Sequence, residues 1–345
     1  MSLVSLLRKN NRKLLFTTPS HGGKICFLHK FYQWYRNDIS EVEALNPEKA
    51  LQEAEERASK IYKTKSTHFL TNGSTSGILA SVLASCKKND KLLIWKHAHT
   101  CHKNAGILSG AEIIEYELPY IEDWGIYGRL EPYTVKELIE KYQPKAIIVT
   151  SPSYEGIVSD IPEISKICKK NNVILIADEA HGALYPFSDK LPDSAISYAD
   201  FTVQSLHKTA GGINPTALLH CNCDLDIAST LKLITTTSPS YPMLATIEAN
   251  INYLASKRGQ KKIEELISQI KLIRQGLTNL EFFGDDITKI LIKKQGLSGF
   301  ELSDILFNKY NIEDERTNEK STMLLTGIGT TEEKLKKLCK LKKLG

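Results

Sequence analysis

This chain has 345 residues, 41% of them hydrophobic and 25% charged, which is the composition of an ordinary globular protein. Its formal net charge of +5, from 45 basic and 40 acidic side chains, is too small an excess to indicate nucleic-acid binding. No segment approaches the ~20 apolar residues of a membrane span. The seven cysteines include no Cys-x-x-Cys pair, and the first residues lack a signal peptide's apolar core, so we expect a cytoplasmic protein with reduced thiols.

The first 45 residues (1–45) are predicted to form an N-terminal arm. Aromatic side chains in this arm predict that it packs on another surface, such as a second subunit. These are Phe27, Phe31, Tyr32, Trp34 and Tyr35. A helix is expected from the Asn46-Pro47 cap to about Lys63, because asparagine caps a helix well and proline fits its first turn.

From residue 66 onward, short apolar runs alternate with helical patterns. The predicted strands are 67–70, 91–95, 112–117, 146–150, 173–177, 201–204 and 217–220. The predicted helices between them are 75–86, 101–108, 134–142 and 161–170. This alternation predicts an α/β fold, with an open and mostly parallel seven-stranded sheet flanked by helices. The runs 147–149 and 173–176 are continuously apolar, as central strands buried on both faces are.

The pattern changes after a long helical stretch at 242–276, which is interrupted near 257–259. Beyond it we expect strands at 288–293 and 322–326 and helices at 299–309 and 331–341. These elements predict a small C-terminal α/β domain, which includes the linking helix. We therefore divide the chain into the arm, a large domain (46–255) and the small domain (256–345).

Two polar segments follow predicted strands, where ligands of open parallel sheets bind. Segment 72–77 (Asn-Gly-Ser-Thr-Ser-Gly) begins a helix, and its backbone N–H groups and hydroxyls would form a cradle for an anion. The alternative is a capped loop without a ligand. Segment 97–103 holds three histidines, whose spacing does not favour a metal site. A flat imidazole stacked on a flat cofactor is the better functional interpretation, against histidines that serve only loop hydrogen bonds.

A lysine and an aspartate at two further strand ends indicate the chemistry. Asp178 ends an apolar run, and a carboxylate in that place is rarely there for packing. Lys208 follows another strand, after Ser205 and His207, which can donate to a phosphate. Pyridoxal 5′-phosphate (PLP) requires such a pair, because a lysine amine forms the Schiff base and an aspartate keeps the pyridine nitrogen protonated. A metal site is not expected.

These segments resemble the ornithine/lysine/arginine decarboxylases, a family of fold-type-I PLP enzymes. The resemblance covers residue 12 to the end. The matching segments are 18–23, 73–77, 101–103, 151–156, 178–182, 205–208, 237–241, 296–302 and 327–331. It implies a large PLP-binding domain with the mostly parallel seven-stranded sheet, and the small C-terminal domain. The family usually has glycine where this chain has Ser20, and a further C-terminal domain beyond residue 345, whose loss we expect to affect the substrate channel or specificity.

The resemblance also implies a role for each site residue. Lys208 would be the Schiff-base lysine, Asp178 the partner of the pyridine nitrogen, and His102 the residue stacked on the ring. His181 would lie beside the cofactor. The phosphate would be held by Ser74, Thr75, Ser205 and His207, with Ser76 adjacent. The arm segment 21–23 would help to line the site. The family forms homodimers with sites at the interface, so the turn at 237–241, with Thr237 and Ser238, would reach the neighbouring site.

The expected reaction is α-decarboxylation of a basic amino acid, namely lysine, ornithine or arginine. No arginine falls within the strand-end segments, and a leaving carboxylate gains nothing from a strong arginine clamp. Glu155 and Asp160 are candidates to bind the basic side chain. The alternatives are another fold-type-I reaction, such as transamination or aldol cleavage, and a PLP-binding homologue without turnover.

Overall fold

The computed structural model describes residues 14–16, 34, 36, 38–40 and 44–344. Most of the predicted arm lies outside these residues, and so does the segment 21–23 that was expected to line the site. The predictions for that segment and for the arm's packing therefore stay predictions.

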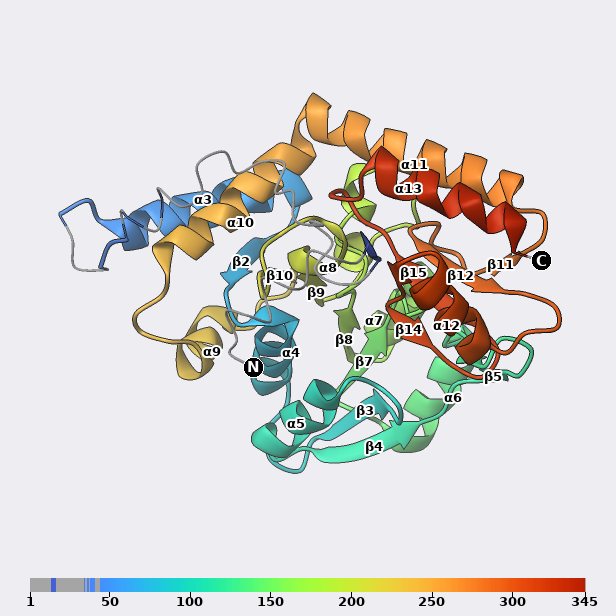
Figure 1. Ribbon diagram of the computed structural model, residues 1–345. Helices are drawn as coiled ribbons and strands as arrows, with labels where there is room; N and C mark the ends of the chain where they lie inside the picture. The colour runs from blue at the N-terminus through green and yellow to red at the C-terminus, as the bar shows by residue number, and fades with distance from the viewer. Residues whose placement is uncertain (1–13, 17–33, 35, 37, 41–43, 345) are drawn as a thin grey trace, which may run out of the picture.

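Seven strands form the main sheet, in the order β2-β10-β9-β8-β7-β3-β4 (Figure 1). They are β2 (Ser66–Leu70), β3 (Lys91–Trp95), β4 (Glu112–Tyr116), β7 (Ala146–Thr150), β8 (Ile174–Asp178), β9 (Phe201–Ser205) and β10 (Ala217–Cys221). Each lies within one residue of its predicted bounds. Strand β10 is antiparallel to both neighbours, and the pairs from β9 through β8, β7 and β3 to β4 are parallel. The mostly parallel sheet is confirmed.

Helices cover both faces of this sheet because its central strands are apolar on both sides. Ile148 and Val203 pack with the helices of one face, and Ile147 and Val149 with those of the other. The first face carries α4 (Gly73–Ser85), α5 (Thr100–Ser109) and α9 (Ile227–Ile234). The second carries α3 (Pro47–Tyr62), α6 (Pro132–Tyr142), α7 (Ile161–Lys170) and α10 (Tyr241–Ala255).

A second, four-stranded sheet belongs to the C-terminal unit, by which we mean residues 257–344. Its order is β11 (Glu281–Phe283), β12 (Lys289–Lys293), β15 (Thr322–Leu325) and β14 (Arg316–Thr317). The helices of the unit are α11 (Lys257–Gly276), α12 (Gly299–Lys309), α13 (Glu332–Leu338) and the 3-10 turn η4 (Cys339–Lys343). The predicted interruption of the long helix falls at Ser256, whose side chain caps α11 by accepting from the Gly259 N–H.

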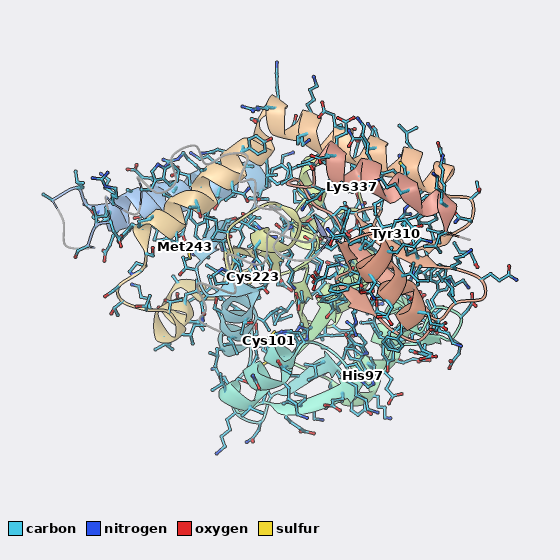
Figure 2. All side chains as sticks on the ribbon, viewed as in Figure 1. His97, Cys101, Cys223, Met243, Tyr310 and Lys337 are labelled. Carbon is cyan, nitrogen blue, oxygen red and sulfur yellow. The ribbon has the colours of Figure 1, made fainter. Side chains whose placement is uncertain are left out.

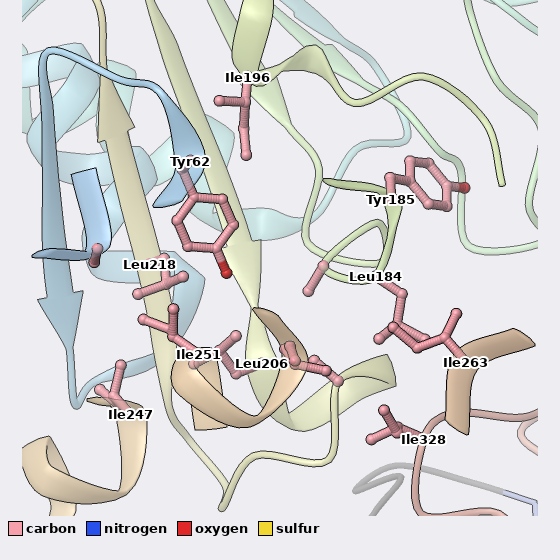
Figure 3. Packing of buried hydrophobic residues seen from close by; sticks show 14 of the residues in the cluster. Tyr62, Leu184, Tyr185, Ile196, Leu206, Leu218, Ile247, Ile251, Ile263 and Ile328 are labelled. Carbon is pink, nitrogen blue, oxygen red and sulfur yellow. The ribbon is translucent and has the colours of Figure 1, made fainter. Parts of the chain in front are cut away.

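The C-terminal unit is joined to the main sheet through a shared core. Ile263 of α11 and Ile328 pack in one cluster with Leu206 and Leu218 of the large sheet region and with Ile251 of α10 (Figure 3). The two parts therefore meet across buried apolar surface. The boundaries at 45 and 255 stay a prediction.

The chain also contains short elements that the hydrophobic pattern does not reveal. They are β1 (Leu14–Leu15), β5 (Tyr120–Ile121), β6 (Ile126–Tyr127), α8 (Leu206–Thr209), β13 (Ile312–Glu313) and the 3-10 turns η2 (Tyr185–Phe187) and η3 (Ala195–Ser197). Strand β1 pairs in parallel with β13, so a segment of the predicted arm completes the C-terminal unit. None of the described helices is long and apolar enough to cross a membrane.

Candidate active site

The carboxyl ends of the parallel strands meet at one edge of the main sheet, and a cavity of about 540 Å³ opens there. Its lining residues include His99, Tyr127, Tyr154, Glu155, Asp178, His181, Lys208 and Arg316. Three of the predicted catalytic residues, Asp178, His181 and Lys208, therefore share one cavity. His102, Ser74, Thr75, Ser76, Ser205 and His207 do not line it.

Asp178 ends β8 opposite Thr150 of β7 and is only 6% exposed. Its Oδ2 accepts a hydrogen bond of 2.8 Å from His102 Nε2, and its Oδ1 accepts one of 3.2 Å from the Ala180 N–H. Burial favours the protonated acid, but His102, with its hydrogen bond and its charge, and the nearby Lys208 together hold the pKa of Asp178 below its usual value. The side chain is thus kept as a carboxylate inside the protein.

The stacking of His102 on a cofactor ring stays a prediction. His102 lies in the first turn of α5, is fully buried, and donates a hydrogen bond from Nε2 to Asp178. The wall of the cavity holds His99 instead, which caps α5 by accepting from the Cys101 N–H at 3.3 Å. The reason is helical geometry: the cap residue stays outside the helix, whereas the residue three positions later turns toward the sheet.

Lys208 lies in α8, directly after β9, and its Nζ is 3.1 Å from His181 Nε2. Burial lowers the pKa of the Lys208 amine, and the charge of Lys289 lowers it further, although Asp178 opposes the shift. Burial and the charges of Lys208 and Lys289 likewise hold the pKa of His181 well below its usual value. The His181 ring also packs against the Tyr154 ring, with ring centroids 4.6 Å apart. These shifts favour a neutral amine beside a neutral imidazole, which is what a nucleophilic lysine needs.

The segment expected to form the phosphate cradle lies at the start of α4. Gly73, with φ of 73°, begins α4, and Ser74 and Thr75 are half-buried at this helix start. Ser76 is buried and its hydroxyl donates to the Gly73 carbonyl at 2.8 Å, and its expected place beside the phosphate stays a prediction. Ser205 Oγ is buried at the end of β9 with no hydrogen-bond partner in the described part of the chain. That unused donor and the helix start fit an anionic oxygen, so the residues present fit a phosphate-bearing cofactor.

His207 Nδ1 lies 3.0 Å from the carbonyl of Thr216, to which it must donate. Burial lowers the pKa of His207, which favours the neutral ring. A neutral ring that donates at Nδ1 carries a lone pair at Nε2, so His207 can donate a second hydrogen bond only when it is protonated. A bound phosphate would favour that protonated form.

A potential metal trio occurs at the same place. The ligand atoms of Cys101, His102 and Asp178 lie within 4.8 Å of one another (Figure 2 labels Cys101). Burial raises the pKa of the Cys101 thiol to about 12, and His102 is already hydrogen-bonded to Asp178. In the described structure these atoms therefore belong to the hydrogen-bonded His102–Asp178 pair with a buried thiol beside it.

Sequence reasoning missed an arginine in the cavity. Arg316 comes from β14 of the C-terminal unit; its Nη1 is 3.5 Å from Glu155 Oε1, and its guanidinium carbon is 5.1 Å from the centre of the Tyr154 ring. Tyr154 in turn donates to Glu315 Oε1 at 2.6 Å. No strand-end pattern could have found Arg316, because it reaches the cavity from the other sheet.

The remaining predicted residues divide between the cavity and the surface. Glu155 lines the cavity, whereas Asp160 caps α7 by accepting from the Glu163 N–H and stays exposed. Thr237 and Ser238 lie in an exposed loop between α9 and α10. Their expected role in a neighbouring subunit therefore stays a prediction.

Comparison with known proteins identifies the family. The family model for the "Orn/Lys/Arg decarboxylase, major domain" matches residues 8–294. The chain belongs to this decarboxylase family. YaaO of Bacillus subtilis (strain 168), named as an uncharacterized protein, is 30% identical over 95% of this chain and 73% of its own length. An arginine decarboxylase of Bacillus anthracis is 28% identical over 83% of this chain and 62% of its own length.

Solved structures agree on the fold. A lysine decarboxylase of Francisella novicida superposes with a TM-score of 0.77 at 19% identity, over 94% of this chain and 57% of that one. An alanine–glyoxylate aminotransferase of Nostoc sp. superposes with a TM-score of 0.70 at 13% identity, over 96% and 95%. The present chain thus has the predicted fold of the fold-type-I PLP enzymes. It spans little more than half the length of the Francisella novicida lysine decarboxylase.

Proposed function

We propose that the protein is a PLP-dependent α-decarboxylase of a basic amino acid, either lysine, ornithine or arginine. The proposal rests on two hydrogen-bonded pairs at one cavity. In one, the Asp178 carboxylate accepts from His102, and in the other the Lys208 amine contacts His181. Membership of the decarboxylase family supports it.

The site residues would hold the cofactor as follows. Asp178 would face the pyridine nitrogen, and Lys208 would carry the aldehyde carbon. Ser74, Thr75 and Ser205 would donate to the phosphate, with His207 joining them when protonated. We propose His102, which contacts Asp178, as the residue that stacks on the ring, and His99, which lines the cavity, as a second candidate for that role. When bound, PLP supplies the electron sink that makes loss of carbon dioxide from an amino acid possible.

The other side chains would serve the substrate. His181 Nε2 lies beside the Lys208 amine, so it can hydrogen-bond to that nitrogen and orient it for proton transfer to the reacting carbon. Arg316 faces the cavity but is already paired with Glu155, so it would hold a carboxylate only weakly, which suits a group that must leave. A basic side chain could bind to Glu155 and to the aromatic rings of Tyr127 and Tyr154.

A second candidate function is transamination or another fold-type-I reaction. Arg316 favours it, since an arginine in the cavity can also retain a substrate carboxylate. A PLP-binding homologue without turnover would require decay of the site, and the intact Lys208–His181 and Asp178–His102 contacts argue against that.

The test incubates the PLP-loaded protein with lysine, ornithine and arginine separately. We expect one of them to give its amine, identified by mass, together with carbon dioxide. Keto-acid formation would favour transamination, and a cofactor absorbance band without any product would favour the inactive homologue. Lys208→Ala should remove both the band and the activity, whereas Lys166→Ala, on an exposed face of α7, should keep both. An active Lys208→Ala protein would overturn the assignment. Sedimentation of the same preparation checks the proposed homodimer.

A further inference from the structure

A charged pair is fully buried where the C-terminal unit meets the cavity. Lys289, which opens β12, and Asp286, in the turn before it, are both 0% exposed, and Nζ lies 2.7 Å from Oδ2. A buried ion pair is costly unless further hydrogen bonds satisfy each ion. We therefore expect both side chains to form hydrogen bonds with other buried groups.

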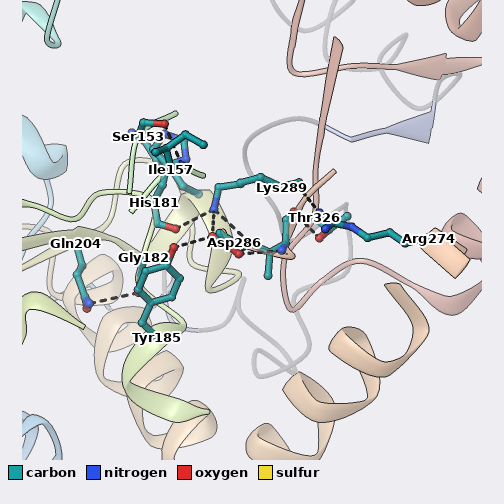
Figure 4. A network of polar contacts seen from close by, with 12 residues as sticks. Ser153, Ile157, His181, Gly182, Tyr185, Gln204, Arg274, Asp286, Lys289 and Thr326 are labelled. Atoms are coloured by element: carbon teal, nitrogen blue, oxygen red, sulfur yellow. Dashed lines mark hydrogen bonds and ion pairs between the residues drawn. The ribbon is translucent and has the colours of Figure 1, made fainter. Parts of the chain in front are cut away.

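The pair binds the turn that follows β8. Lys289 Nζ also donates to the His181 carbonyl at 3.1 Å and to Thr288 Oγ1 at 3.2 Å, so all three N–H bonds of the ammonium are used (Figure 4). Asp286 Oδ2 accepts a bond of 2.9 Å from the Tyr185 hydroxyl, and its Oδ1 accepts from the Thr288 N–H and hydroxyl. A residue of the C-terminal unit thus holds the backbone of His181, whose ring contacts the Lys208 amine.

The same pair also contacts a second loop of the cavity. Gly156, with φ of 90°, follows Tyr154 and Glu155, and its carbonyl accepts from the N–H groups of Asp285 and Asp286 at 3.0 Å each. A Cβ atom at Gly156 would lie 2.8 Å from Lys289 Cγ. The lysine stem therefore fills the space beside this glycine. The His181 turn thus contacts the Lys289–Asp286 side chains, and the Gly156 loop contacts the Lys289 stem and the backbone of Asp285 and Asp286.

We infer that Lys289, paired with Asp286, is a positioning residue that links the C-terminal unit to the cavity by holding the His181 turn against Lys208 and the Gly156 loop against the cavity wall. It touches no reacting atom, so it acts through His181. The kinetic readout of this inference rests on the proposed function, but its structural readout does not.

A charged group suits this position better than an apolar one. An apolar side chain could fill the space beside Gly156, but it would leave the His181 carbonyl without its buried donor. The charge also acts on the site: Lys289 lowers the pKa of Lys208, together with burial and against Asp178, Cys101 and Glu315. Removing this charge should therefore raise the pKa of Lys208 and of His181, whose pKa Lys289 also lowers.

The test compares Lys289→Met with Leu306→Ala, a variant of the buried core of the C-terminal unit away from both loops. In the cofactor-free proteins, we expect amide hydrogen exchange at 180–182 and 153–156 to accelerate by at least about 10-fold in Lys289→Met only. In the PLP-loaded proteins, the pH midpoint of the cofactor's visible band should rise in Lys289→Met only. For the proposed reaction, kcat should fall by roughly 10- to 100-fold, because small misplacement of a catalytic group is costly.

A double variant, Lys289→Met with Asp286→Asn, keeps the test valid if the single variant folds poorly. It leaves no unpaired buried charge, so its melting temperature should recover toward that of the parent protein. The positioning role predicts that its loops stay fast in exchange. If exchange returns to the parent values with the melting temperature, the pair is merely structural and the inference is overturned. The exchange readout needs neither PLP nor turnover, so it separates this failure from failure of the proposed function.

Discussion

At the scale of single residues, the sequence was sufficient to find groups that stand at strand ends. Lys208 and Asp178 follow apolar runs, so their place in one cavity could be expected. The positions of His99 and His102 could not be expected, because they depend on how α5 begins and which of its faces turns toward the sheet. Nor could the sequence show that the Ser76 hydroxyl donates to the Gly73 carbonyl within the same helix start.

His102→Leu should lower both the activity and the stability of the protein without abolishing either. The change removes the donor to Asp178 Oδ2, so the pKa of this carboxyl should rise and its buried oxygen should lose a partner. We expect kcat/KM to fall by about 10- to 100-fold, as when an orienting partner of a functional group is lost, and the unfolding free energy to fall by about 1–3 kcal/mol. His68→Leu in β2, outside the cavity, is the control. Full activity of His102→Leu would contradict the role.

Glu179 should give the protein a pH-dependent stability. Burial raises the pKa of its carboxyl to about 7, although Ala195, Ser194 and Gln204 donate to it. Between pH 4.5, the ordinary pKa of a glutamate, and pH 7, Glu179 keeps its proton in the folded state but has lost it in the unfolded chain. Stability from this group is therefore complete below pH 4.5 and is lost as pH rises through 7, by at most about 1.4 kcal/mol per pH unit.

Urea unfolding across this pH range checks the expectation. In Glu179→Gln, which keeps the shape and cannot titrate, the decline between pH 4.5 and 7 should be smaller than in the parent protein. Parallel curves for the two proteins would show that Glu179 does not titrate in this window.

At the scale of elements, the long periodic patterns were enough to place the main sheet and its helices. The strands β5 and β6 of the hairpin and the strands β13 and β14 have two residues each. So short a run carries no periodic signal. Arg316 stands on β14, so the missed element explains the missed site residue. Elements defined by their tertiary partners cannot be found from local pattern alone.

The close packing of α4 on the sheet gives an element-scale prediction. A Cβ atom at Gly77 would lie 2.7 Å from Val203 Cγ1 of β9. Gly77→Ala should therefore lift the helix that starts the phosphate cradle and cost about 1–3 kcal/mol of stability. Gly276→Ala, at the end of α11, meets only the flexible end of Lys342 and serves as the matched control. Thermal unfolding of both proteins checks this, and equal melting temperatures would contradict it.

At the scale of the whole molecule, the two ends of the described chain meet in one core. Phe16 follows β1, is 1% exposed, and packs with Ile312, Leu324 and Leu335 of the C-terminal unit. Its backbone bonds Glu313 and Leu325. A division of the sequence by pattern put this segment in the arm, because nothing local shows that a strand of two residues pairs with another about 300 positions later.

Phe16→Ala should destabilise the C-terminal unit rather than the main sheet. A buried phenylalanine replaced by alanine costs about 3–5 kcal/mol. Hydrogen exchange should increase in β12 and β15 more than in β7 and β8, because only the former share a core with Phe16. Phe300→Ala, with a side chain that is 53% exposed, should change stability by less than about 0.5 kcal/mol. Equal effects of the two substitutions would contradict this account.

The pairing of β1 with β13 has a consequence for how the protein is made. The ribosome synthesises Leu14–Leu15 early and the partner strand Ile312–Glu313 late. At about 5–20 residues per second, roughly 15–60 seconds separate the two events. Throughout that interval the nascent polypeptide carries the segment 14–16 before its partner strand and most of the core around Phe16 have been made, so the C-terminal unit can be completed only after synthesis has almost ended.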